Sequence, residues 1–294
     1  IGESTERQHA PPAGAEVDED DLCAAEQQRG ADQVLRIKYA DVLGSLMEVH
    51  KEVFVAGALQ STVQVVQEHI GLDRGPNDRY LGLYIGCDLI QRLGQDSVAV
   101  WPAFVSHMVG SVTDEDAWVR QAAAKGVMHA APLAEFGPLA NHAAQQLGRA
   151  AARLEAWTEF YAEGTEAVVA ALGQVCRRQP GNVDGWDGYI LEFLNGLPLT
   201  KDLEIIGRTH DLFMELVLEG HQVLQLNLGK VCSVLLEIYK KESNSEWLDQ
   251  CIRSFCVQLG EERVRQLQPP LSAKHRKRLQ RVVRDAKQAP LKQT

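Results

Sequence analysis

The 294-residue sequence is 45% hydrophobic and 24% charged, which is ample for a folded core but long for one compact domain, so two domains or one repeat array are expected. Its formal net charge of −10 argues against general nucleic-acid binding and favours basic protein partners. No stretch approaches the roughly 18 consecutive apolar residues of a membrane helix, so no membrane association is predicted.

The first 30 residues form an acidic segment that we expect to be flexible. It holds eight Asp or Glu residues against Arg7 and Arg29, a net charge of −6. So few large apolar groups cannot offset the entropy lost on ordering. We interpret residues 1–30 as a solubilising segment, and mimicry of an acidic ligand is the alternative. Because the sequence begins at Ile1 rather than Met, we also expect a fragment of a longer protein.

A helical period follows the acidic segment and continues to the end of the chain. Helices are predicted at 32–49, 53–70, 77–93, 98–112, 119–130, 137–153, 163–178, 186–197, 202–218, 226–239, 246–259 and 272–287. The apolar positions of the first helix lie on one stripe, as on the buried face of an amphipathic helix. They are Leu35, Tyr39, Val42, Leu43, Leu46 and Val49. Strand signals are nearly absent.

The clearest helix pair lies between residues 98 and 137, where two apolar stripes flank the acidic turn Asp114-Glu115-Asp116. The stripes are Trp101, Phe104, Val105, Met108, Val109 and Val112, and then Val119, Ala122, Ala123, Gly126, Val127 and Ala130. Carboxylates in the turn suit the positive end of the second helix. The small residues of that helix allow close packing. One such pair cannot close a core alone, so similar neighbours are expected.

The helices recur with a period near 40 residues. Arg79 and Arg120 occupy equivalent positions 41 residues apart, and the helices expected at 163 and 202 begin 39 residues apart. Such a two-helix repeat is typical of HEAT or armadillo arrays. We therefore predict an all-α fold, a HEAT-repeat α-solenoid in which antiparallel helix pairs form a right-handed superhelix. The array is expected over residues 31–268, followed by a basic capping helix and tail at 269–294.

Five segments, taken in order, resemble the C-terminal repeats of an importin-β superfamily (karyopherin-β) receptor. They are DEDD, VLRIKYADVLGSLMEVHKEVF, PNDRYLGLYIGCDLIQRLG, TDEDAWVRQAAAKGVMHAAPLAEFG and GWDGYILEFLNGLPLTKDLEI. The collinear resemblance runs from about Val17 to Ala286 and looks closest to the importin-five or karyopherin-β3 branch. VRQAAA alone is a generic HEAT phrase, so the ordered set carries the resemblance. The alanine-rich middle and the basic last helix depart from the family pattern.

The resemblance implies a nuclear import receptor that shuttles between the cytoplasm and the nucleus. Such a receptor binds basic protein cargo on its concave face, binds Phe-Gly nucleoporins between its outer helices and releases cargo to the GTPase Ran. In the family, Ran is held mainly by repeats N-terminal to this stretch, so this chain would hold part of a cargo surface. The alternative hypothesis is a HEAT-repeat scaffold or regulatory subunit of a multiprotein complex, which shares the architecture.

Six residues near the starts of second helices are candidates for partner binding. They are Asp78, Arg79, Asp114, Asp116, Trp118 and Arg120. The five charged residues could contact basic cargo. However, charged groups at helix starts also serve as N-caps and as ion pairs between repeats, and this structural interpretation is favoured. Trp118 lies off the main apolar stripe of its helix, so it is the better candidate for an exposed Trp.

No catalytic, metal-binding or cofactor-binding group is predicted, and we expect a non-enzymatic protein. The nine histidines form neither HExxH nor a cluster with Cys or Asp, and the sequence lacks GxSxG and P-loop motifs. The six scattered cysteines are expected to be reduced and buried. In the tail, the spacing of Leu279, Val282 and Val283 favours a capping helix, and a nuclear-localisation or nucleic-acid patch at KHRKR is the alternative.

Overall fold

The computed structural model describes residues 19–153, 155–159 and 161–288, and the fold of this part of the chain is helical without a strand. The chain divides into two compact units, residues 1–139 and 140–294. We describe each unit by itself. Both are built from consecutive helix pairs, as the period of the sequence predicts.

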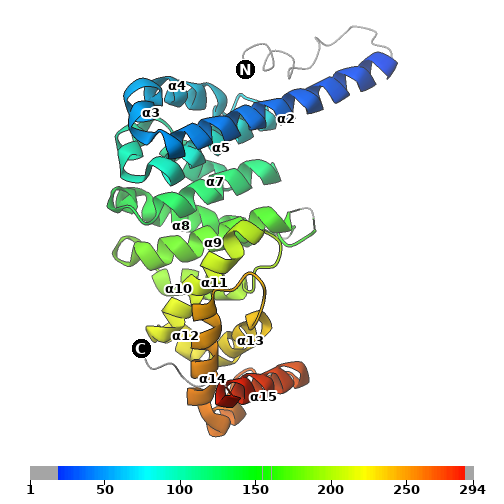
Figure 1. Ribbon diagram of the computed structural model, residues 1–294, viewed down its shortest axis with the longest axis vertical. Helices are drawn as coiled ribbons and strands as arrows, with labels where there is room; N and C mark the ends of the chain where they lie inside the picture. Colours follow the sequence, from blue (N-terminus) through cyan, green and yellow to red (C-terminus); the bar gives the residue numbers. More distant parts are fainter. Residues whose placement is uncertain (1–18, 154, 160, 289–294) are drawn as a thin grey trace. The chain divides into compact units, whose positions relative to one another are not determined.

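In the N-terminal unit, α5 packs against α2, α4 and α7, and the helices α2, α5 and α7 lie side by side (Figure 1). The elements of this unit are α2 (Glu19–Val49), α3 (Lys51–Gly57), α4 (Leu59–His69), α5 (Pro76–Leu93), η1 (Gly94–Ala103), α6 (Val105–Ser111), α7 (Ala117–Ala130) and η2 (Ala134–Phe136). The helix expected at 53–70 is interrupted at Ala58, whose φ of −120° separates α3 from α4.

Both apolar stripes of the pair at 98–137 are buried, as predicted. The first half is not one α-helix, however. It begins as the 3-10 helix η1, which contains Pro102, and the chain turns at Phe104 (φ −150°) before α6. Proline has no amide N–H for an α-helical bond, which accounts for the break. At Gly126 an added Cβ would lie 2.2 Å from Sδ of Met108, so a larger residue there would require the side chain of Met108 to move.

The helix α2 begins at Glu19, so residues 19–30 of the acidic segment are helical, and the expected flexibility of this segment stays a prediction. Residues 1–18 lie outside the described part of the chain. The expectation rested on the shortage of large apolar groups. The helix here is favoured by the two alanines, two glutamines and one glutamate of residues 24–28, which have high intrinsic helix propensity.

The buried face of α2 also differs from its predicted apolar stripe. Arg36 and Met47 are buried, whereas Tyr39 is 51% exposed and Val49 is 71% exposed. The cause is the buried ion pair between Arg36 of α2 and Asp78 of α5, which holds this face of α2 against α5. The described residues of this unit leave the apolar stripe of α2 exposed to solvent.

The C-terminal unit continues the same pattern of helix pairs. Its elements are α8 (Gly137–Ala151), α9 (Ala162–Arg178), η3 (Pro180–Asn182), α10 (Trp186–Asn195), α11 (Leu203–Leu218), α12 (Gln222–Leu226), α13 (Leu228–Ile238), α14 (Glu246–Gln266) and α15 (Ala273–Gln288). Phe193 of α10 and Phe213 of α11 meet edge to face in the core, with ring centroids 6.2 Å apart. The helix α15 packs on α13 and α14 and buries Val282.

A buried carboxylate fixes the start of α11. Glu166 of α9 accepts hydrogen bonds from the amides of Thr200 (2.5 Å), Lys201 (2.8 Å) and Asp202 (3.0 Å). Asp202 in turn accepts a hydrogen bond from the amide of Glu204, which caps the helix. A buried carboxylate without hydrogen-bond donors destabilises the fold, so these bonds offset the free-energy cost of burying Glu166.

His210 on α11 should make the C-terminal unit less stable in mild acid. Burial lowers the pKa of this imidazole to about 4, and its Nε2 accepts a hydrogen bond from the amide of Leu199 at 3.3 Å. Between about pH 6.5 and 4 the imidazole binds a proton in the unfolded chain but not in the folded chain. The free energy of unfolding therefore falls as the pH is lowered, by up to about 1.4 kcal/mol per pH unit. Above this pH window the imidazole is neutral in both the folded and the unfolded chain, so it no longer makes the stability depend on pH.

The measurement is urea unfolding of the wild type and His210→Gln at several pH values from 7.5 to 4.5. The variant should show a flatter dependence within the window, and the matched change His142→Gln, at an exposed position of the same unit, should leave the wild-type slope. A wild-type slope that persists in His210→Gln would contradict the assignment.

Candidate protein-binding surface

The acidic turn before α7 acts first as a helix cap. Oδ1 of Asp116 accepts hydrogen bonds from the amides of Trp118 (2.9 Å) and Val119 (3.0 Å). The backbone of Asp116 is extended, at φ −79° and ψ 132°, as an N-cap requires. The side chain is therefore used in holding α7, which agrees with the structural interpretation of the sequence.

Two arginines hold the same turn from both of the helices that meet there. Arg79 of α5 makes a bidentate pair with Asp114, with Nε and Nη2 at 3.0 and 2.8 Å from the two carboxylate oxygens, and its Nη1 donates to the carbonyl of Arg74. Arg120 of α7 is buried and donates to the carbonyls of Asp114 (2.6 Å) and Glu115 (2.8 Å). Bidentate pairs of this kind fix geometry as well as adding energy.

Asp78 lies at the start of α5 but faces into the unit. Its carboxylate accepts from Nη2 of Arg36 at 2.5 Å, and the exposed fractions of the two side chains are 3% and 1%. The pair therefore joins α2 to α5, and its buried side chains are not accessible to a partner protein. Of the six candidate residues, the structure places the five charged ones in contacts within the unit.

Trp118 is the exception, because 53% of its surface is exposed. Its ring meets Tyr80 edge-on at 6.3 Å between centroids, and Tyr80 lies 5.9 Å from Tyr84. Tyr84 donates a hydrogen bond from its hydroxyl to Asp41 of α2 at 2.8 Å. Burial and this bond raise the pKa of Tyr84, so it stays a protonated donor. Trp118, Tyr80 and Tyr84 thus form an aromatic ladder across α7 and α5.

The surroundings of the aromatic ladder favour a cation. Glu115 is exposed in the turn that precedes Trp118, and Asp41 lies at the other end of the ladder. Residues 1–139 hold 21 Asp or Glu against ten Lys or Arg, a net charge of −11. Aromatic faces attract ammonium and guanidinium groups, most strongly at Trp. The arrangement suits the Lys and Arg side chains of a protein partner.

A hollow of about 560 Å³ adjoins the pair of Arg79 and Asp114. One wall is apolar, formed by Ile70 and the strongly exposed Leu72, and the opposite wall is formed by the end of α6 and the acidic turn. It offers a second contact for a partner that lies along these helix ends.

The described residues show little that would support redox or nucleophilic chemistry. Of the five described cysteines four are buried, as predicted, whereas Cys251 is only partly buried. Burial raises the pKa of Cys176, Cys232 and Cys256 to about 12, so these thiols stay protonated. In the described ranges no three His, Cys, Asp or Glu side chains are grouped so as to hold a metal ion. The described helices include none that is long and apolar enough to cross a membrane.

Comparison with known proteins identifies the fold. No protein-family model matches the chain. Among solved structures, it is similar to a Kap121p mutant in which three acidic residues are replaced by lysine, with a TM-score of 0.62 over 90% of this chain. The fold is that of a karyopherin-type HEAT solenoid. The two sequences are 15% identical and this chain spans 26% of the length of the other, so the likeness concerns the fold alone.

The sequence does not single out Tyr80 and Tyr84 as exposed, because their spacing places them on the apolar stripe of the helix expected at 77–93. A signal for the aromatic ladder exists in the repeat period. Residues one repeat apart come into contact, as in Asp41 with Tyr84 at a separation of 43 and Arg92 with Glu48 at a separation of 44. Aligning the second helices at this spacing would have paired α2 with α5 residue by residue.

Removal of the buried carboxylate at residue 78 should strongly destabilise the N-terminal unit. Asp78→Ala would leave the guanidinium of Arg36 buried without its counter-ion, which typically costs about 3–5 kcal/mol. The free energy of unfolding from urea titration measures this. Replacing both partners, as Arg36→Met with Asp78→Leu, should recover most of the loss because no charge is then stranded.

The control is the exposed pair of Lys51 and Asp96, whose side chains are about half exposed. Asp96→Ala should cost under about 1 kcal/mol. An equal effect of Asp78→Ala and Asp96→Ala would show that the buried pair does not hold α2 to α5.

Proposed function

We propose that this chain is part of a nuclear import receptor of the importin-β superfamily, related to the importin-five or karyopherin-β3 branch, and that its role is binding rather than catalysis. Two observations support the proposal. The fold is similar to that of Kap121p, an importin-β family karyopherin. Independently of the fold, ordered segments of the sequence resemble the same superfamily. A receptor of this kind would shuttle between the cytoplasm and the nucleus.

The observation that carries the proposed cargo contact is the exposure of Trp118 against Tyr80. In the proposal, Trp118 stacks on a Lys or Arg side chain of basic cargo, and the exposed carboxylate of Glu115 pairs with a neighbouring cation. Asp78, Arg79, Asp114, Asp116 and Arg120 hold the helices that present this surface. In the proposal, these residues position Trp118 and Glu115 but do not contact the cargo themselves.

Two further features fit a segment of a longer solenoid. The exposed apolar stripe of α2, which includes Tyr39, Val42 and Val49, would be covered if another helix pair stacked on it. Ran would be bound mainly by such additional repeats. The hollow beside Ile70 and Leu72 has an apolar wall that would suit the phenylalanine of a Phe-Gly nucleoporin.

The test is the affinity of the chain for a fluorescent basic cargo peptide rich in Lys and Arg, measured by anisotropy at physiological salt. Trp118→Ala should weaken binding about tenfold, the effect of losing one aromatic anchor of about 1.4 kcal/mol. Thermal unfolding should change little because the side chain is half exposed. The matched variant Trp247→Ala, at a similarly exposed Trp on α14, should bind as the wild type does.

A Phe-Gly repeat peptide provides the second arm. A folded chain that binds neither peptide would contradict the transport proposal and favour the scaffold alternative. Binding of the basic peptide that is equally strong in Trp118→Ala would instead contradict the proposed position of the contact.

A further inference from the structure

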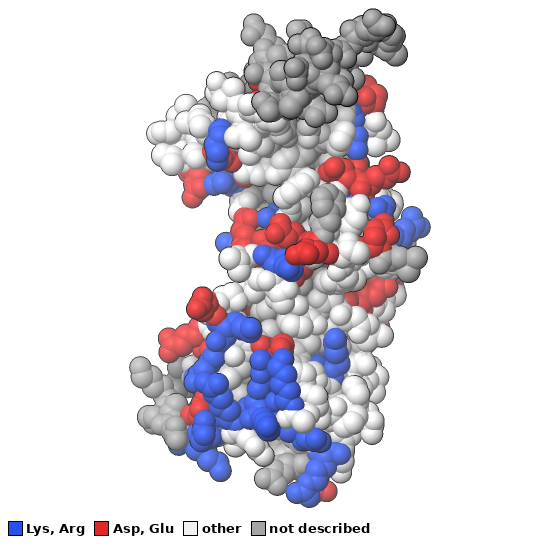
Figure 2. Space-filling view, turned by 90° about the vertical axis from the view of Figure 1, so that its right-hand side faces the viewer, with Lys and Arg blue, Asp and Glu red and all other residues white. Residues whose placement is uncertain are grey.

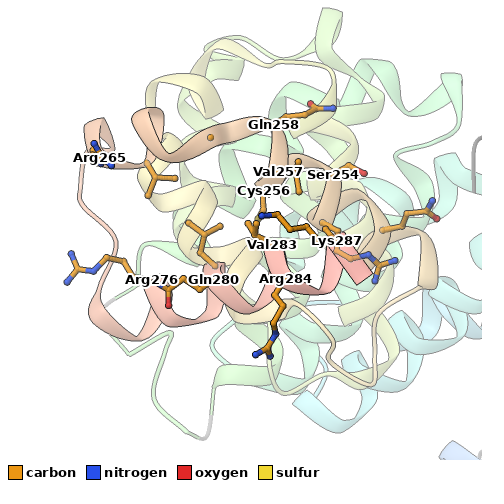
Figure 3. A pocket seen from close by; sticks show the side chains of 16 residues that line it. Ser254, Cys256, Val257, Gln258, Arg265, Arg276, Gln280, Val283, Arg284 and Lys287 are labelled. Atoms are coloured by element: carbon orange, nitrogen blue, oxygen red, sulfur yellow. The ribbon is translucent and has the colours of Figure 1, made fainter. Parts of the chain in front are cut away.

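A groove of about 980 Å³ lies between α14 and α15 in the C-terminal unit (Figure 3). A kink shapes it, because Gly260 in the middle of α14 has a φ of 68° and a ψ of 161°, outside the helical range. Positive φ is readily adopted by glycine only. The kink brings Val264 and Arg265 of the second part of α14 to the wall of the groove.

The groove combines an apolar floor with a basic rim. Cys256 and Val257 of α14 face Val283 of α15 across it, and Arg265 and Arg276 lie together at one end (Figure 3). Val257 is 51% exposed, so part of this floor is open to solvent. No carboxylate is among the described residues that line the groove.

The basic residues of α15 lie on several faces of the helix. On the face toward α13, Lys274 and Arg278 pair with Glu237, and Asp285 pairs with Lys240. This face buries Val282 and explains how the helix is held on the unit.

On the groove face, four cations have no carboxylate partner among the described residues. Within the described ranges, no carboxylate lies at salt-bridge distance from Arg253, Arg276, Arg284 or Lys287, all of which line the groove. Figure 2 shows Lys and Arg side chains gathered on one face at the level where Figure 1 places α14 and α15. The groove is therefore both apolar and electropositive.

We propose that this groove binds an amphipathic helix with acidic residues, presented by a partner protein. Apolar side chains of the partner would enter between Val257 and Val283, and its carboxylates would pair with the rim, as in other helix-in-groove complexes. From Arg276 to Lys287 the groove face of α15 extends about 16 Å, at 1.5 Å per residue. That length accommodates about three turns of a partner helix.

The lining distinguishes this partner from a nucleic acid and from the basic cargo proposed above. Single-stranded nucleic acids are bound through aromatic stacking platforms, and no aromatic side chain is among the described residues of the lining. Basic cargo would be repelled by the rim. The inference stands on the groove itself and does not depend on the transport proposal.

The experiment measures binding of the full chain to a labelled 16-residue helical peptide that has leucines on one face and glutamates on the other. Arg276→Glu with Lys287→Glu should weaken binding at least tenfold, and Val257→Ser should weaken it at least threefold. The matched control is Lys277→Glu with Arg281→Glu, which makes the same charge change at exposed positions of α15 that do not line the groove. This control should change affinity less than twofold.

A peptide with lysine in place of glutamate should not bind. Equal weakening by both double variants would overturn the proposal, since the attraction would then be non-specific. Failure of the glutamate peptide to bind the folded wild type would also overturn it. So would single-stranded DNA or anionic vesicles that bind more tightly than the peptide with the same dependence on Arg276, Lys287 and Val257, because the site would then belong to another class of ligand.

Discussion

The bidentate contact between Arg79 and Asp114 fixes how α5 meets the turn before α7 in the N-terminal unit. It ties the start of α5 to the turn before α7, at a point where Arg120 and Asp116 hold the same turn from the other side. These charged side chains contact neighbouring helices and fix their register, so they are not available to bind a partner protein. What remains exposed at this register is the side chain of Trp118.

The two units present surfaces of opposite character. The N-terminal unit carries the acidic surplus together with the aromatic ladder, whereas α14 and α15 carry Lys and Arg side chains around an apolar groove. A HEAT solenoid is suited to such a division because each helix pair contacts only its neighbours. One repeat can therefore acquire a binding surface without changing the others.

The sequence predicts the helices well because the apolar period of 3.6 residues is strong and the repeat recurs. Trp101 and Val119 are buried as their stripes require. The failures have local causes. Pro102 converts part of a helix into a 3-10 turn, and the buried face of α2 is chosen by the ion pair of Arg36 with Asp78 rather than by its apolar residues. The pattern of apolar residues carries no information about a buried ion pair, so the buried face of α2 could not be predicted from it.

In the proposed arrangement, the charged residues at the starts of the second helices hold the stack while the aromatic ladder contacts the partner. A double-mutant cycle of Arg79→Ala and Asp114→Ala tests this directly, with urea unfolding and basic-peptide affinity measured on the same four proteins. We predict a coupling free energy of about 1–3 kcal/mol in stability and, under folding conditions, less than threefold change in affinity. Coupling near zero with a loss of affinity above tenfold would contradict the account.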